Sequence, residues 1–357
     1  MSESAVSPKG RLRFEAARHI LERAIAERAF PSAVIEVGTA GEPLWRRAFG
    51  TLTFDAAAAT TDDTIFDLAS LTKVVATTPM VMQQVERGVL ALDDPVSGHV
   101  AAWSGDDRTD VTLRDLLAHC SGLPGWRPFF RELKGRAGYE TAIAGEPLEY
   151  PPRTRSIYSD LDFMLLGFIV DGRMPMAERF ALMLSQMGIV EEIQFVPPAL
   201  WRARIAPTEY DSWRGRLLVG EVHDENAAAL GGIAGHSGLF GTAAAVGSYA
   251  RHLLQVLDGR RGAVRRTTLE EFMTRRSDVP GSSRALGWDT MLPTSSCGSK
   301  MSSRAFGHTG FTGTSLWIDP EKNVYVVLLT NRVHPTRAND AIKQVRPAVH
   351  DAVMSEL

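Results

Sequence analysis

The sequence predicts an α+β fold, in which an antiparallel sheet flanked by terminal helices is combined with an all-helical domain. Two strand-like segments near the start, 32–38 and 44–50, are separated only by a turn, and two more, 314–319 and 323–331, repeat this arrangement near the end. Strands joined by such short connections pair antiparallel, because a parallel pair needs a long crossover. Both ends of the chain are therefore expected to contribute to one sheet.

Helical patterns at both ends of the chain are expected to cover this sheet. Apolar residues recur at the spacing of one helix face within residues 10–29 and again from Ile342 to Val353. Pro347 lies inside the second segment and should kink it, because proline has no N–H to donate within a helix.

The middle of the chain has a different pattern. Residues 72–250 show mostly helical periodicity and loops, and the glycine-rich segment 220–243 is expected to be largely loop. We therefore expect a sheet domain made of residues 1–80 and 231–357, a mainly helical domain of residues 81–230, and an active site between them.

The composition is that of an ordinary globular protein and excludes several classes. The chain has 357 residues, 44% of them hydrophobic, and a formal net charge of −3. No apolar run is long enough to predict a membrane span, and the near-neutral charge gives no general basis for binding nucleic acid. Two cysteines, Cys120 and Cys297, and a start without the apolar core of a secretory signal lead us to expect a cytoplasmic protein.

A serine and a lysine three residues apart, Ser70 and Lys73, form the first candidate catalytic pair. They begin a predicted helix, where positions i and i+3 share one face. A serine becomes a nucleophile when a neighbouring base takes its proton, and a lysine of lowered pKa is such a base. Alone this spacing is common, and an ordinary helix start is the plainer interpretation. Pro79 should kink or end this helix near Thr78 without disturbing the pair.

Two further short motifs follow in order, each at the start of a predicted element. Tyr158-Ser159-Asp160 precedes an amphipathic helix, and His308-Thr309-Gly310 precedes the strand at 314–319. Taken singly, the first is typical of a helix cap and the second of a turn. Together with the serine–lysine pair they indicate a catalytic site. The sequence contains no G-x-S-x-G, H-E-x-x-H or glycine-rich nucleotide-binding motif.

These motifs resemble those of the serine β-lactamase and penicillin-binding-protein superfamily, on its class C-like side. The resemblance covers nearly the whole chain. It rests on SLTK (70–73), LLAHCSGLP (116–124), YSD (158–160), GGIAGHSGLF (231–240) and GHTGFTG (307–313). The superfamily includes D-alanyl-D-alanine peptidases, family VIII carboxylesterases and an exo-acting amidase, so the resemblance specifies the fold better than the substrate.

The resemblance implies a β-lactamase/transpeptidase-like fold and a role for each motif. Ser70 would be the acylated nucleophile, Lys73 would accept or relay its proton, and Tyr158 would serve as the second general base and as acid to the leaving group. The strand that begins at His308 would edge the site. The backbone N–H groups of Ser70 and Phe311 would form the oxyanion hole.

Two departures from the superfamily pattern bear on the substrate. Asp160 stands where asparagine is common, and beside Lys73 its carboxylate would favour a charged lysine that holds Tyr158 as a phenolate. His308 stands where lysine is common, and a histidine near its ordinary pKa of about 6.5 is mostly neutral at pH 7. We therefore expect weak binding of β-lactams, and tighter binding of anionic substrates below about pH 6.5.

Further residues are expected to contact the substrate. Thr309 and Gly310 accompany His308 as substrate-binding residues, and Asp160 joins them from the second motif. Trp126 is the best candidate for a wall of the site. His223 and His236 lie in the glycine-rich segment and are candidates for substrate contact, although loop hydrogen bonding is the plainer interpretation. Their spacing is not that of a metal site, so we expect no metal and no cofactor.

His119 ends a predicted helix beside Cys120, where we expect it to bond local carbonyls.

The function predicted from the sequence is that of a serine hydrolase. It would act through an acyl-enzyme on a small amide or ester, such as a muropeptide-type amide or a short-chain ester. The alternatives are a weak β-lactamase or D,D-carboxypeptidase and, in another class, a catalytically silent binding module of the same fold. A small-molecule substrate is expected, with no nucleic-acid or membrane partner, and the oligomeric state is left open.

Overall fold

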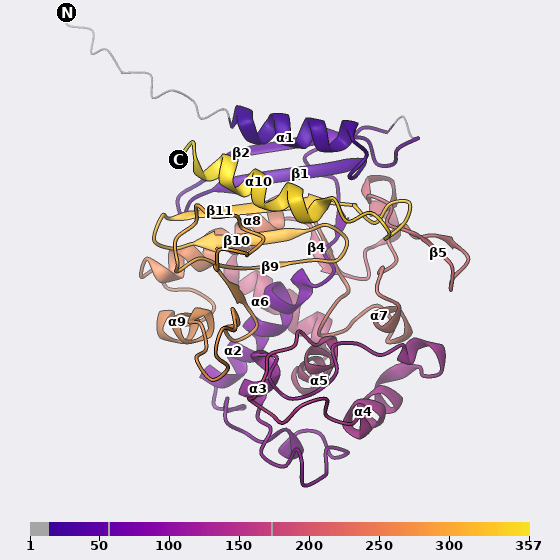
Figure 1. Ribbon diagram of the computed structural model, residues 1–357, viewed down its shortest axis with the longest axis vertical. Helices are drawn as coiled ribbons and strands as arrows, with labels where there is room; N and C mark the ends of the chain where they lie inside the picture. The colour runs from indigo at the N-terminus through magenta and orange to yellow at the C-terminus, as the bar shows by residue number, and fades with distance from the viewer. Residues whose placement is uncertain (1–13, 56–57, 173) are drawn as a thin grey trace, which may run out of the picture.

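A six-stranded antiparallel sheet joins the two ends of the chain in the computed structural model, which describes residues 14–55, 58–172 and 174–357 (Figure 1). Its strand order is β2-β1-β11-β10-β9-β8. The strands are β1 (Ser32–Gly38), β2 (Pro43–Gly50), β8 (Asp289–Thr290), β9 (Phe306–Thr309), β10 (Ser315–Asp319) and β11 (Val324–Thr330). The four strands predicted from the sequence are confirmed to within one residue at each end.

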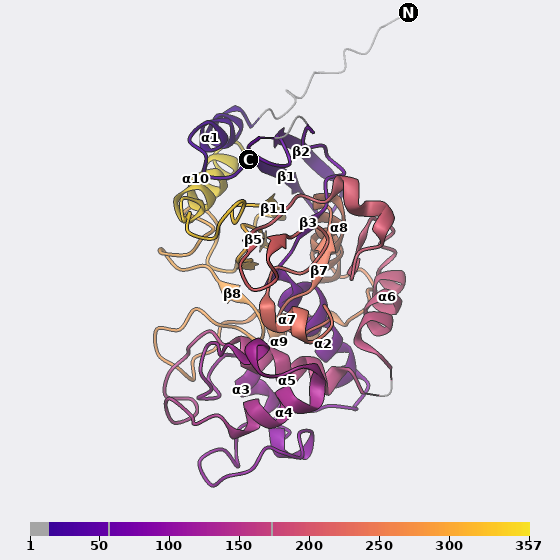
Figure 2. The same ribbon diagram turned by 90° about the vertical axis from the view of Figure 1, so that its right-hand side faces the viewer.

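Different helices cover the two faces of this sheet, as Figure 2 shows with the sheet lying between them. Helices α1 (Glu15–Ala26) and α10 (Ile342–Met354) pack on one face with Ile35 of β1, whereas α8 (Ala243–Leu257) packs on the other with Val34. Neighbouring strand residues point to opposite faces, so both β1 and β11 are buried throughout. Both predicted terminal helices are present, although α1 is shorter than the predicted range 10–29, of which residues 10–13 lie outside the described residues, and α10 continues through Pro347.

The remaining helices form the lower half of the molecule in Figure 1 and complete the predicted α+β architecture. They are α2 (Thr78–Glu86), α3 (Leu113–Leu117), α4 (Gly135–Gly145), α5 (Asp160–Val170), α6 (Met176–Met187), α7 (Glu225–Ala229) and α9 (Arg266–Met273), with 3₁₀ turns at Val96–Gly98, Phe129–Arg131 and Ala199–Arg204. Ser159 caps α5, as its position predicts. Across the described residues, every helix falls short of the length and apolar character needed to cross a bilayer.

A second, three-stranded sheet departs from the expectation of helices and loops over residues 72–250. It has the order β3-β7-β4 and consists of β3 (Phe66–Asp67), β4 (Ile193–Phe195) and β7 (Leu239–Gly241), while β5 (Tyr210–Asp211) and β6 (Arg216–Leu217) form a separate pair. The segment 220–243, expected to be largely loop, contains both α7 and β7. The second sheet joins strands from both predicted domains, and the domain division stays a prediction.

The helix that follows Ser70 contains a π-helical turn, Lys73–Thr77, directly before α2. The N–H of Thr78 donates to the carbonyl of Lys73 across this wider turn. Pro79 lies in the first turn of α2, where its missing N–H costs little. The helix continues past Thr78 into α2, and Ser70 and Lys73 stay in contact as expected, with Nζ 3.1 Å from Oγ. The turns between Ser70 and Pro79 are not regular, however, because the π-helical turn extends back to Lys73.

Gly235 allows the loop before β7 to touch α5. A Cβ atom at Gly235 would lie 2.0 Å from the carbonyl oxygen of Phe163 and 2.7 Å from the Cα of Gly167. The carbonyl of Gly235 in turn accepts a hydrogen bond of 2.6 Å from the hydroxyl of Thr77. The contact between Gly235 and Gly167 thus determines how closely this loop approaches α5 next to Lys73.

Replacing Gly235 by alanine should lower the free energy of unfolding by about 1–3 kcal/mol, the usual cost of overpacking. Chemical denaturation of the variant measures this. Gly145→Ala is the matched control, because nothing lies within 4 Å of a Cβ atom there and the residue is helical. The control should unfold at the wild-type denaturant concentration or higher. Equal stability of the two variants would contradict the proposed packing.

Candidate active site

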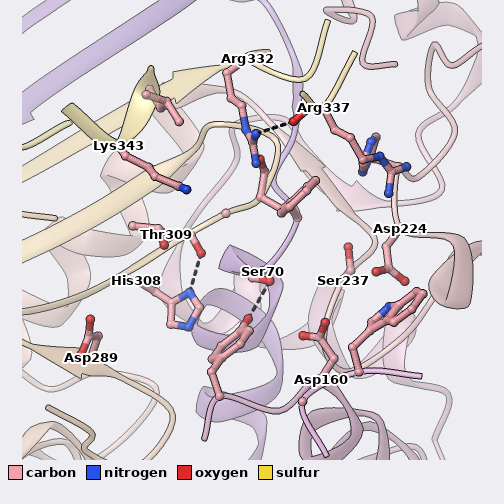
Figure 3. A pocket seen from close by; sticks show the side chains of 18 of the residues that line it. Ser70, Asp160, Asp224, Ser237, Asp289, His308, Thr309, Arg332, Arg337 and Lys343 are labelled. Atoms are coloured by element: carbon pink, nitrogen blue, oxygen red, sulfur yellow. Dashed lines mark hydrogen bonds between the residues drawn. The ribbon is translucent and has the colours of Figure 1, made fainter. Parts of the chain in front are cut away.

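A cavity of about 790 Å³ brings together most of the candidate site residues (Figure 3). It is lined by Ser70, Trp126, Tyr158, Asp160, His223, His308, Thr309, Gly310 and Phe311, with further residues named below. Lys73 and His236 do not line it but lie directly behind Ser70 and Asp160, which Lys73 contacts. The structure thus places motifs that are 85 to 240 residues apart in the sequence in one site.

Ser70 stands on a sharp turn between β3 and the helix that follows. The preceding residue, Ala69, has a φ of 46°, which residues other than glycine rarely adopt, and its N–H donates to Asp67 Oδ1 over 2.8 Å. The other oxygen of Asp67 accepts the N–H of His223 over 2.6 Å. One buried carboxylate therefore holds the serine turn against the loop that forms the opposite wall.

Lys73 is fully buried, and all three of its N–H bonds have acceptors. Its Nζ lies 3.1 Å from Ser70 Oγ, 2.7 Å from Asp160 Oδ1 and 3.1 Å from the carbonyl oxygen of His236. Burial lowers the pKa of Lys73, but the charge of Asp160 and the hydrogen bond to it, together with the nearby Tyr158 hydroxyl, outweigh this, so that its pKa is raised above the ordinary value of 10.5. The expected contact between Asp160 and Lys73 is confirmed, and Lys73 is a cation in this site.

Tyr158 donates a hydrogen bond of 2.8 Å to Ser70 Oγ. Burial raises the pKa of this phenol, and the Lys73 ammonium, whose Nζ lies 4.8 Å from the ring centre, only partly offsets the rise. The phenol is therefore protonated at neutral pH, and the expectation of a resting phenolate is wrong. Ser70 Oγ accepts from two proton donors, so this arrangement holds no free base.

His308 is buried beside Tyr158, with its ring centre 5.6 Å from that of the phenol. Its Nδ1 lies 2.8 Å from the carbonyl oxygen of Thr309, which makes Nδ1 the protonated nitrogen. Burial, together with the charges of Arg284 and Lys73, holds the pKa of His308 well below 6.5. The expectation that anionic substrates bind more tightly just below pH 6.5 is therefore wrong, because His308 stays neutral there.

The two histidines of the glycine-rich segment bind different carboxylates. His223 Nε2 lies 2.9 Å from Glu209 Oε2, whereas His236 Nε2 lies 2.8 Å from Asp224 Oδ1. His223 lines the cavity, its ring 5.7 Å from that of Phe311. His236 lies behind the cavity, where its backbone carbonyl accepts from Lys73 and its ring binds Asp224, which lines the cavity. In the part of the chain that the structure describes, no three His, Cys, Asp or Glu residues form a group that would hold a metal ion.

The segment 119–125 holds the Tyr158 motif in place through backbone and side-chain hydrogen bonds. His119 Nδ1 accepts the N–H of Ser159 over 3.1 Å, the Ser159 hydroxyl donates to the carbonyl of Pro124 over 2.7 Å, and Asp160 N–H donates to Gly125 over 2.8 Å. The His119 ring centre lies 4.8 Å from that of Tyr158. The expectation that His119 bonds local carbonyls is wrong, since its partner is 40 residues away.

Several cations at the cavity were not predicted from the sequence. They are Arg284, Arg332, Arg337, Lys343 and Arg346. Arg337 is paired with Glu209 and Glu225, but among the described residues Arg332 and Arg346 have no carboxylate partner and donate to backbone carbonyls. They belong to none of the sequence motifs: four of the five lie between residues 332 and 346, in the loop after the last strand and the start of the last helix.

Comparison with known proteins agrees with this geometry. The family model described as Beta-lactamase matches residues 17–350. The chain belongs to the beta-lactamase family. A Salmonella gallinarum (strain 287/91 / NCTC 13346) protein named "Putative D-alanyl-D-alanine carboxypeptidase" is 31% identical over 320 residues, which cover 79% of this chain and 72% of that protein.

Solved structures show that this beta-lactamase-family chain has the predicted β-lactamase/transpeptidase-like fold. A penicillin-binding protein homologue from Caulobacter crescentus superposes with a TM-score of 0.77 at 20% identity, covering 99% of each chain. EstCE1, described as a hydrolase with promiscuous acyltransferase activity, gives 0.73 at 19% identity and covers 94% of this chain and 98% of its own.

Replacing Asp160 by asparagine should lower the pKa of Lys73, because the carboxylate that favours the ammonium is removed while burial is retained. The measurement is ¹³C NMR of the lysine Cε resonances, which is practical with only six lysines. Asp289→Asn is the control, since Asp289 lines the same cavity without contacting Lys73. An unchanged Lys73 titration in the Asp160 variant would show that this ion pair does not hold the charge.

Proposed function

We propose that this protein is a serine hydrolase that forms an acyl-enzyme at Ser70 from a small, carboxylate-bearing amide or ester. One observation carries the proposal: at the edge of a cavity, Ser70 Oγ accepts hydrogen bonds from both Lys73 and Tyr158. A buried lysine and a half-buried tyrosine that converge on one serine hydroxyl form the arrangement that activates a serine nucleophile, which argues against a catalytically silent module.

Tyr158 is the member of this group that moves the proton. Lys73 keeps its charge because of Asp160, so loss of a proton from the group produces a Tyr158 phenolate beside an ammonium. The phenolate takes the proton of Ser70 as Oγ bonds to the substrate carbonyl carbon. The resulting phenol gives the proton to the leaving group as the amide or ester bond breaks. Water then attacks the acyl-enzyme by the same steps in reverse.

The negative charge on the reacting oxygen needs donors near Ser70. Over the described residues, the backbone N–H groups of Ser70 and Phe311 donate to no protein acceptor, and both residues line the cavity. We assign them the oxyanion hole, where Ser70 adds the favourable field of a helix start.

The unpaired cations favour a substrate that carries a carboxylate. Arg346 Nη2 donates to the carbonyls of Gly310 and Thr314 over 2.7 and 2.9 Å. Burial and the neighbouring Arg332 lower the pKa of Arg346 to about 9, so it is still charged at pH 7. Burying an uncompensated charge is costly, and a substrate carboxylate would offset that cost. A peptide C-terminus has this chemistry, which makes D,D-carboxypeptidase activity the second candidate.

Trapping Ser70 tests the proposal directly. A fluorophosphonate should add once to the wild-type protein, at Ser70, and mass spectrometry of the digest locates the adduct. Ser70→Ala should abolish both labelling and the hydrolysis of p-nitrophenyl acetate. Nitrocefin, a D-alanyl-D-alanine peptide and N-acetylmuramoyl-L-alanine then rank the substrate classes. Absence of any adduct on folded wild-type protein would favour the silent binding module.

The pH–rate profile should follow the ionisation of Tyr158. With an uncharged ester, kcat/KM should rise with pH into the alkaline range, because the deprotonated group is the active one and the pKa values of Tyr158 and Lys73 are both raised. Asp160→Asn should shift this rise to lower pH, since Asp160 raises both pKa values. Tyr158→Phe should lower kcat/KM by about 10²–10⁴-fold. Full activity in Tyr158→Phe would assign the proton transfer to another group.

A further inference from the structure

We propose that the cavity wall formed by Trp126, Asp224 and Ser237 binds a free ammonium group on the acyl part of the substrate. The preferred acyl donor would then be an amino acid ester, an amino acid amide or a short peptide with an unblocked amine. This inference rests on the proposed function, because it assigns the other half of the same substrate.

The position of Tyr158 decides which part of the substrate meets this wall. Tyr158 gives its proton to the leaving group, and its ring lies against that of His308. The leaving group therefore lies on the His308 side of Ser70. Figure 3 shows Asp224 and Ser237 on the other side of Ser70, so they face the acyl part.

Asp224 supplies the carboxylate of this wall, and one of its two oxygens is left without a partner among the described residues. Its Oδ1 accepts hydrogen bonds from His236 Nε2 over 2.8 Å and from the N–H of Ala227 over 2.7 Å. Its Oδ2 accepts none from the described residues, although the side chain is only 20% exposed. The neighbouring carboxylates are paired with permanent cations, Asp160 with Lys73 and Glu225 with Arg337, whereas the only basic side chain bonded to Asp224 among the described residues is His236. His236 and these hydrogen bonds outweigh the effect of burial and keep the pKa of Asp224 below its ordinary value.

Ser237 and Trp126 add independent acceptors for a cation. The Ser237 hydroxyl lines the cavity, is 97% buried, and has no hydrogen-bond partner among the described residues. An unsatisfied buried hydroxyl is unfavourable, and a substrate N–H group would satisfy it. Trp126 lines the same cavity and is 43% exposed, and indole is the aromatic group that best attracts an ammonium. A carboxylate, a hydroxyl and an indole together suit a primary ammonium.

Three matched esters test this assignment: the benzyl esters of alanine, N-acetylalanine and lactic acid, each as both enantiomers. Wild-type protein should turn over one enantiomer of the alanine ester with a kcat/KM about tenfold or more above those of the acetylated ester and of the uncharged lactate ester. Asp224→Asn should reduce these ratios about tenfold, while it keeps a side chain that can cap α7. Ratios cancel any general loss of activity.

The control variant is Asp289→Asn, which removes a carboxylate from the His308 side of the same cavity and should keep the wild-type ratios. Ser237→Ala should lower them by a smaller factor. If Asp224→Asn does not fold, the kcat/KM ratios of the wild-type protein and of Ser237→Ala still test whether this wall binds an ammonium group. Hydrolysis of p-nitrophenyl acetate with no preference for the alanine ester over the other two esters would overturn the inference and leave the proposed function standing. Loss of Ser70 labelling and of acetate hydrolysis would overturn both.

Discussion

The buried ammonium of Lys73 is the interaction on which the rest of the site depends. Removing such an ion from water costs several kcal/mol, and the structure offsets this with three acceptors at hydrogen-bond distance. These acceptors belong to three separate segments: the turn at Ser70, the start of α5 at Asp160, and the loop at His236. One charge therefore fixes the relative positions of the serine, the tyrosine motif and the glycine-rich wall.

Much of the nearby backbone can be understood as support for that charge. The π-helical turn that begins at Lys73 accommodates Pro79 without breaking the helix, and its Thr77 hydroxyl holds the carbonyl of Gly235. Because Gly235 has no Cβ, this loop approaches α5 closely enough for the next carbonyl, that of His236, to reach the ammonium. A larger residue at position 235 would move the carbonyl of His236 away from Lys73 and so disturb the site without contacting the cavity.

The sequence predicts those features that depend on local pattern or on motif order. Four of the six strands of the main sheet are long enough to be predicted, whereas the short β8 and β9 were not, and the motifs at Ser70, Tyr158 and His308 meet as their resemblance implies. The second sheet was missed because two or three residues per strand carry no period. The low pKa of His308 was missed because it depends on burial and on Arg284, which is 24 residues away in the sequence and joins it only in the folded chain.

The departures from the superfamily pattern make sense as one change in charge. Asp160 stands where the superfamily commonly has asparagine and adds a negative charge beside Lys73. The neutral His308 stands where the superfamily commonly has lysine, so that a positive charge is absent from the other side of Tyr158. Arg284 supplies a cation there instead, with its guanidinium 5.2 Å from the centre of the Tyr158 ring. Tyr158 thus keeps positive charges on two sides, which lowers the cost of forming a phenolate during the reaction. At the same time a neutral His308 leaves the proposed recognition of a substrate carboxylate to arginines and a lysine outside the three motifs.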